Sequence, residues 1–242
     1  SDSYYTGTFD GNGKTISGLW TNGTSGYNGL FYYVLEGGIV KNLTVQVAKE
    51  KTVKGSSYTG VIAGLCYGNI ENCSAYGSLE TNNQATGGIT GALGKTGLVK
   101  DCFAYADIKS SYVCAGGIVG DSHGSVENCF FYGTINSTSS RVGGIVGGTA
   151  TSLKGCVSMA TSLIASDNMI GRIIGAAGDT MQYTNNLAYS RTLLNGFAEP
   201  SGYEKAVNGN SISMKDSFKK STYTDLGWSF DEDGVWAISE AE

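Results

Sequence analysis

Proline, histidine and charged side chains are scarce in this sequence. Its 242 residues include 1 Pro and 1 His, and Asp, Glu, Lys and Arg together reach 15%, against about 25% in average soluble domains. The single histidine, His123, cannot build a zinc centre with two histidine ligands, and the formal net charge of -5 gives no basic surface for nucleic acid or anionic lipid. We therefore expect no metal, no cofactor and no nucleic acid.

Long hydrophobic runs are also missing. No segment approaches the roughly 18–20 apolar residues of a membrane span, and residues 1–5 lack the basic start and apolar stretch of a signal peptide. We therefore expect no membrane span and no export signal within this chain.

Glycine is the abundant residue, with 37 copies. The 40% of hydrophobic residues and the low net charge exclude disorder, and the lack of a three-residue glycine period excludes collagen. The composition predicts a folded β protein punctuated by glycine.

The glycines belong to a repeated phrase of the form Gly-Gly-Ile-Val-Gly. Its central apolar residues are separated by 32, 27, 29, 27 and 28 residues and are Leu30, Ile62, Ile89, Ile118, Ile145 and Ile173. A second phrase, of the form Val-Glu-Asn-Cys, ends 11 to 14 residues after each of these. A period near 28 with two short β-branched segments per unit indicates a repeat architecture.

We predict an all-β fold, a right-handed parallel β-helix or solenoid of about six coils. One unit cannot cover its own apolar side, so units stack and bring equivalent residues about 4.8 Å apart. Residues 1–190 form the coils, with 1–25 as the first segment of the stack, and 191–242 form a C-terminal capping segment. An antiparallel sandwich or propeller also fits the spacing, but the vertical alignment of unusual residues favours the solenoid.

The second phrase predicts three ladders. One is a buried row of thiols with leucine in its first and last copies: Leu43, Cys73, Cys102, Cys129, Cys156 and Leu187. Stacked neighbours are close enough for a disulfide, so that alternative stays open. The preceding position is a turn that suits left-handed backbone: Asn42, Asn72, Asp101, Asn128, Gly155 and Asn186. The position before that alternates in charge as an exposed ion ladder: Lys41, Glu71, Lys100, Glu127 and Lys154.

A row of tyrosines is the candidate ligand surface. Tyr76, Tyr105 and Tyr132 stand three residues beyond the cysteine position, and Met159 follows them. Aromatic rings in a row either pack against each other or form a platform for sugars. No catalytic residues are assigned.

The two ends differ from the middle. Residues 5–19 alternate polar and apolar around Asp-Gly-Asn-Gly and predict a strand-turn-strand unit. Residues 211–220 predict a short serine-capped helix, and an aromatic tail with Tyr223, Trp228, Phe230 and Trp236 follows. Because the end of a solenoid exposes an apolar cross-section, we expect this tail to form a lid.

These phrases resemble the GLUG-repeat segments of large bacterial surface proteins, including adhesins and immunoglobulin A1-specific metallopeptidases. The resemblance covers residues 5–190 and 211–238. It implies a β-helical region, extracellular or on the outer cell surface, that displays or spaces other domains. The peptidase members carry a His-Glu-x-x-His motif that this chain lacks, so their activity does not transfer.

The leading hypothesis is a non-catalytic surface module for adhesion or ligand display, with a host or neighbouring-cell surface protein or glycan as partner. A spacer region of a larger immunoglobulin A1 protease-like protein is one alternative. A β-helical polysaccharide lyase or glycosidase is another, and it rests on fold analogy alone.

Overall fold

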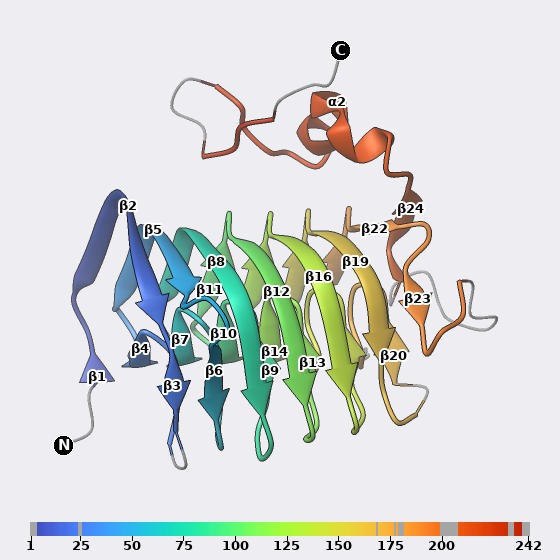
Figure 1. Ribbon diagram of the computed structural model, residues 1–242. Coiled ribbons are helices and arrows are strands. Elements are labelled where there is room, and N and C mark those ends of the chain that lie inside the picture. Colours follow the sequence, from blue (N-terminus) through green and yellow to red (C-terminus); the bar gives the residue numbers. More distant parts are fainter. Residues whose placement is uncertain are drawn as a thin grey trace.

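The computed structural model describes residues 4–23, 26–167, 169–176, 178, 182–198, 208–231 and 235–238. The chain forms a nearly all-β parallel solenoid of about six turns, in which each strand pairs with its counterpart one coil away (Figure 1). The predicted β-solenoid is confirmed, and the sandwich and propeller alternatives are wrong because the strand pairings are parallel.

Three sheets form the walls of the solenoid. One contains β1 (Tyr4–Tyr5), β4 (Phe31–Val34), β7 (Ala63–Cys66), β10 (Thr90–Leu93) and β14 (Val119–Ser122). A second contains β9 (Thr86–Gly87), β13 (Ala115–Gly116), β17 (Val142–Gly143) and β20 (Ile170–Gly171).

The third and largest sheet bends around a corner. One limb contains β11 (Leu98–Lys100), β15 (Ser125–Glu127), β18 (Ser152–Lys154) and β21 (Gln182–Thr184), and the other contains β12 (Phe103–Ser110), β16 (Phe130–Ser137), β19 (Val157–Ile164), β22 (Leu187–Tyr189), β23 (Leu193–Leu194) and β24 (Asn210–Ile212). The early coils add β2 (Thr8–Leu19), β3 (Thr21–Asn22), β5 (Ile39–Val47), β6 (Thr52–Gly55) and β8 (Asn69–Thr81). In β5 and β8 a single strand passes through the corner and joins both limbs.

The glycine phrase connects the two smaller sheets through a tight turn. Its central residue points into the core, and Ile89, Ile118 and Ile145 are fully buried. Its last glycine lies against the backbone of the preceding coil. A Cβ on Gly120 would stand 2.5 Å from the carbonyl oxygen of Gly91 and 2.6 Å from the amide nitrogen of Thr86. Glycine recurs at this position because the two sheets meet backbone to backbone.

The corner of the largest sheet uses left-handed backbone, as predicted. The φ angles are 55° at Asn42, 47° at Asn72, 53° at Asp101, 51° at Asn128 and 64° at Gly155. In the last coil the left-handed residue is Asn185, with φ 56°, so the prediction of Asn186 is wrong by one residue. Asparagine and glycine tolerate this conformation better than other residues do.

The position after the corner is a hydrogen-bonding position as well as an apolar one. Each thiol in the row donates to a carbonyl oxygen two residues earlier, as Cys102 does to Lys100 at 3.2 Å and Cys129 does to Glu127 at 3.1 Å. All six cysteines are free and buried. The predicted thiol row is confirmed from Leu43 to Cys156, and the disulfide alternative is not.

Asn186, rather than Leu187, occupies this position in the last coil, because Leu187 pairs with Val157. Asn186 is 6% exposed, donates to the carbonyl oxygen of Leu153 at 2.9 Å and accepts from the amide of Cys156 at 2.9 Å. Cys156 makes equivalent contacts one coil earlier, with the carbonyl of Val126 and the amide of Cys129. The prediction of Leu187 is wrong because the position requires a hydrogen-bonding group as well as a buried one.

The alternating charges lie in register, and the row begins one coil earlier, at Asp10. Lys41 and Asp10 form an ion pair at 3.5 Å. Within the described parts of the chain, the other pairs closer than 4.0 Å lie outside this row, Lys54 with Glu80 and Lys219 with Asp216. The predicted ion ladder is therefore an alternation of charge with one direct ion pair.

Both ends correct the predicted local structure. Residues 5–19 do not form a strand-turn-strand unit: β2 pairs in parallel with β5, and positive φ angles of 48° at Asn12 and 68° at Gly13 bend it at the same corner. Residues 211–220 are not one helix. They contain the end of β24, a 3-10 turn η1 (Asp216–Phe218) and the start of α2 (Lys220–Thr224).

The described part of the aromatic tail lies on the side of the solenoid (Figure 1). Tyr223, Leu226 and Trp228 pack against Val157 and Met159, which point outward from β19. The indole nitrogen of Trp228 donates to the carbonyl oxygen of Gly155 at 2.8 Å. The contacts described for this segment are thus lateral, whereas a lid would cover the terminal cross-section.

Candidate functional site

The structure brings the predicted tyrosines together in one row. Tyr76 pairs with Tyr105, Tyr105 with Tyr132 and Tyr132 with Met159 on the outer face of β8, β12, β16 and β19. Tyr105 is 49% exposed and Tyr132 is 38% exposed. Their ring centroids lie 5.3 Å apart with planes tilted by 50°. The row is accessible, but these two rings do not make one flat platform, and the buried Met159 ends it beneath the tail.

A second surface is formed by the residues that stand two positions before the first glycine of each phrase. The pairings of β9, β13, β17 and β20, and the bridges of Thr59 to Asn28 and Thr86, align this position from coil to coil. We call it the variable register, because it holds a different residue type on nearly every coil. Its residues are Tyr27, Tyr58, Ala85, Cys114, Arg141 and Met169.

The N-terminal half of this surface is aromatic. Tyr27 stacks on Tyr58 with centroids 5.7 Å apart and planes 24° apart. Tyr33 contacts Tyr27 at 5.9 Å and Tyr67 at 5.7 Å. These side chains come from the sheet of β4 and β7 and from the loops that face it, so several tyrosines share one exposed side of the first coils.

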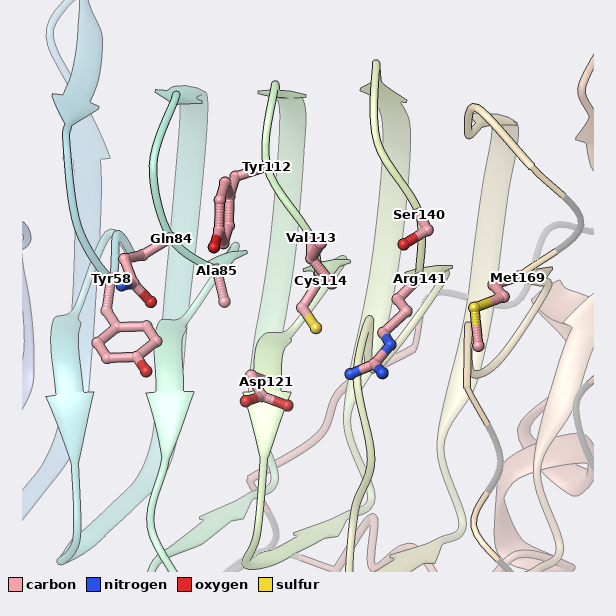
Figure 2. A pocket seen from close by; sticks show the side chains of 10 residues that line it. All are labelled: Tyr58, Gln84, Ala85, Tyr112, Val113, Cys114, Asp121, Ser140, Arg141 and Met169. Atoms are coloured by element: carbon pink, nitrogen blue, oxygen red, sulfur yellow. The ribbon is translucent and has the colours of Figure 1, made fainter.

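The tyrosine stack ends at Ala85, and a pocket of about 350 Å³ opens there (Figure 2). The small side chain of Ala85 leaves the neighbouring ring of Tyr58 uncovered along the row. Tyr112 borders the pocket from the adjoining loop, Asp121 from β14 and Arg141 from two coils beyond Ala85. The pocket therefore combines aromatic, acidic and basic side chains.

Backbone conformation sets this pocket apart from the same position on other coils. Cys114 has φ 73° and Arg141 has φ 61°, and neither residue type favours the left-handed region. Tyr58 and Ala85 hold ordinary φ angles in the same register. Unfavourable backbone of this kind concentrates at functional sites.

The pocket contains one acidic and one basic side chain, Asp121 and Arg141. Burial raises the pKa of the Cys114 thiol to about 11, the carboxylate of Asp121 adds to the rise, and a contact with Arg141 opposes it. Burial also raises the pKa of Tyr58, with a smaller contribution from Asp121. Thiol and phenol are both neutral at pH 7, so the charged groups are Asp121 and Arg141. Across the described residues neither forms an ion pair shorter than 4.0 Å.

An apolar hollow of about 390 Å³ lies between the tail and the outer face of the largest sheet. Phe103, Phe130, Trp228 and Trp236 line it, and Trp228 stacks on Trp236 with centroids 4.2 Å apart. The indole nitrogen of Trp236 is buried and finds no hydrogen-bond partner within the described part of the chain. This hollow belongs to the contact between the tail and the coils.

The sequence predicts the first tyrosine row but not the variable register. The tyrosine recurs with the repeat period, whereas the residue type in the variable register does not. Two signals were available: tyrosines gather at Tyr27, Tyr33, Tyr58 and Tyr67 outside the ladders, and each variable residue has a fixed offset from the glycine phrase.

The fold and the surfaces define the chain as a parallel β-solenoid with a varied lateral face. No protein-family model matches the sequence, so the GLUG resemblance stays a prediction. Halomucin from Haloquadratum walsbyi is 39% identical over 100 residues, which are 41% of this chain, and the match spans about 1% of halomucin.

A crystal structure described as a "putative immunoglobulin A1 protease" from Bacteroides ovatus has the same fold. The TM-score is 0.72 over 97% of this chain and 77% of that chain, with 22% sequence identity. At this identity the likeness establishes architecture alone. Within the residues that the structure describes, no helix is long and apolar enough to cross a membrane.

Proposed function

We propose that the chain is a non-catalytic module of a larger extracellular or cell-surface protein that binds a ligand along the side of the solenoid. The observation that supports this proposal is the change of residue type along the variable register. Core, corner and glycine positions repeat from coil to coil, whereas the row from Tyr27 to Met169, which includes the buried Ala85 and Cys114, changes its chemistry at nearly every step. Binding residues on a rigid repeat scaffold are expected to vary in this way, because the scaffold fixes their positions without depending on their identity.

The comparisons support the proposed location. The similarity to halomucin and the fold shared with a protein described as a "putative immunoglobulin A1 protease" are consistent with a surface or extracellular protein. The partner on this proposal is a surface protein or glycan of a host or neighbouring cell. Adhesion and ligand display both require such a surface.

The arrangement of carboxylates favours binding over hydrolysis. Glu71 and Glu127 lie in register two coils apart, roughly 9.6 Å at the usual strand spacing, with Lys100 between them. That separation is close to the upper limit for an inverting glycosidase pair. Lys100, however, stands in register between the two carboxylates, where an inverting pair needs room for water and the sugar. Glu71 also accepts a hydrogen bond from Asn69 at 2.9 Å.

The test measures binding and turnover with the same purified chain. An array of glycans and matrix proteins should show saturable binding, and incubation with the bound polysaccharide should release no shorter products. Depolymerisation that disappears in Glu71→Gln or Glu127→Gln would establish the glycosidase or lyase alternative instead. Absence of saturable binding to any surface glycan or protein would leave the chain as a spacer and refute the proposal.

A further inference from the structure

We propose that the pocket between Tyr58 and Arg141 binds one unit of a neutral carbohydrate chain. This inference rests on the proposed function and adds the chemical class of the ligand and the residues that hold it. It places the ligand in the variable register rather than on the tyrosine row of Tyr76, Tyr105 and Tyr132.

One face of the Tyr58 ring is open to the pocket. Along the row, one side of the Tyr58 ring is covered by Tyr27 at 5.7 Å, and the next position is the small Ala85. An aromatic face carries negative charge density and attracts the weakly positive C–H groups on the flat side of a sugar ring. Tyr112, 44% exposed, offers a second ring at the rim (Figure 2).

Polar side chains line the pocket together with the two tyrosine rings. Asp121 can accept from two neighbouring hydroxyl groups, Arg141 can donate to hydroxyl or ring oxygens, and the amide of Gln84 can do both. Because Asp121 and Arg141 both lie on the wall of the pocket, their charges balance. The pocket wall then has no net charge that would attract an ionic sugar, so neutral sugars fit this set better.

The size and rigidity of the pocket also suit one sugar unit. A volume of about 350 Å³ lies at the small end of pockets that hold small molecules. The pocket lies on the side of the solenoid, so a chain can extend along the coils in either direction. Asp121 belongs to the paired strand β14, and the loop residues Ala85, Cys114 and Arg141 directly precede paired strands. Such preorganisation lowers the entropy cost of binding.

The experiment uses the whole chain and a glycan array that carries neutral and sialylated oligosaccharides. Titration calorimetry with the best neutral binder then compares three variants. Tyr58→Ala removes the aromatic face, and Asp121→Asn removes the acceptor charge while keeping the shape of the side chain, so it addresses the site even if Tyr58→Ala folds poorly. Tyr105→Ala is the matched control, because it deletes an exposed tyrosine from the other surface.

We expect Tyr58→Ala and Asp121→Asn each to weaken binding at least about tenfold, and Tyr105→Ala to change it by less than about twofold. The reverse pattern, loss with Tyr105→Ala alone, would overturn this inference and leave the proposed function standing, as would saturable binding to a protein with no glycan bound. Preference for sialylated over neutral glycans would also overturn it. Failure to bind any surface ligand would overturn both proposals.

Discussion

Two registers of the same solenoid follow opposite rules. At the corner of the largest sheet the chain repeats one arrangement from coil to coil. A left-handed residue is followed by a buried residue, and from Cys73 to Asn186 that buried residue can donate and accept hydrogen bonds. In the variable register, the residues range from tyrosine to alanine, cysteine, arginine and methionine over the same coils. The paired backbone therefore determines the residue type at the corner, whereas in the variable register the residue type differs from coil to coil.

The largest effect is expected where repeated glycines bring two sheets into contact. Gly120→Ala places a methyl group 2.5 Å from the carbonyl oxygen of Gly91 and 2.6 Å from the amide nitrogen of Thr86. Both are backbone atoms that a side-chain movement cannot relieve. We expect the free energy of unfolding to fall by up to about 3 kcal/mol, measured by guanidinium denaturation followed by circular dichroism.

Tyr112→Ala is the control for this change, because it alters an exposed side chain of the variable surface. Its effect on the free energy of unfolding should stay within about 0.5 kcal/mol. Equal losses for Gly120→Ala and Tyr112→Ala would contradict the division between a determined scaffold and a free surface.

A smaller effect is expected at the corner. Asn128 holds φ 51°, so Asn128→Ala should cost about 1–2 kcal/mol of unfolding free energy, because alanine tolerates left-handed backbone poorly. Asn128→Gly is the matched control, since Gly155 occupies this register one coil later with φ 64°. If the glycine variant loses as much stability as the alanine variant, the backbone conformation is not what this position requires.

The two registers also explain what could be predicted from sequence. The coil register was readable because glycine, asparagine and cysteine recur at a period near 28, and the tyrosines of β8, β12 and β16 align as expected. In the last coil the apolar pattern predicts Leu187 at the cysteine position. Asn186 occupies the position instead, because its side-chain amide reproduces the hydrogen bonds of a thiol.

The pocket itself could not be predicted from the repeat. It exists because Tyr27, Tyr58 and Ala85 meet across sequence separations of about one coil, and Asp121 joins them from a different sheet. Each of these residues is unremarkable within its own repeat. Only the stacking of coils shows that a large ring is followed by two small side chains and then by an arginine.

The smallest effect on stability, and the sharpest distinction between the registers, is expected from Ala85→Tyr. A third ring after Tyr27 and Tyr58 continues the stack and fills the pocket of about 350 Å³. Ala85 is 3% exposed but lines the pocket, so the added ring has space to enter. We expect the free energy of unfolding to change by about 1 kcal/mol or less, because aromatic contact with Tyr58 offsets the added bulk. Glycan binding should be lost, because the added ring takes the place of the sugar. Ala85→Ser keeps the pocket open and should retain binding in the same titration. If Ala85→Tyr unfolds the chain, the variable register is as constrained as the corner. If Ala85→Tyr folds and still binds the glycan, the ligand binds elsewhere on the solenoid.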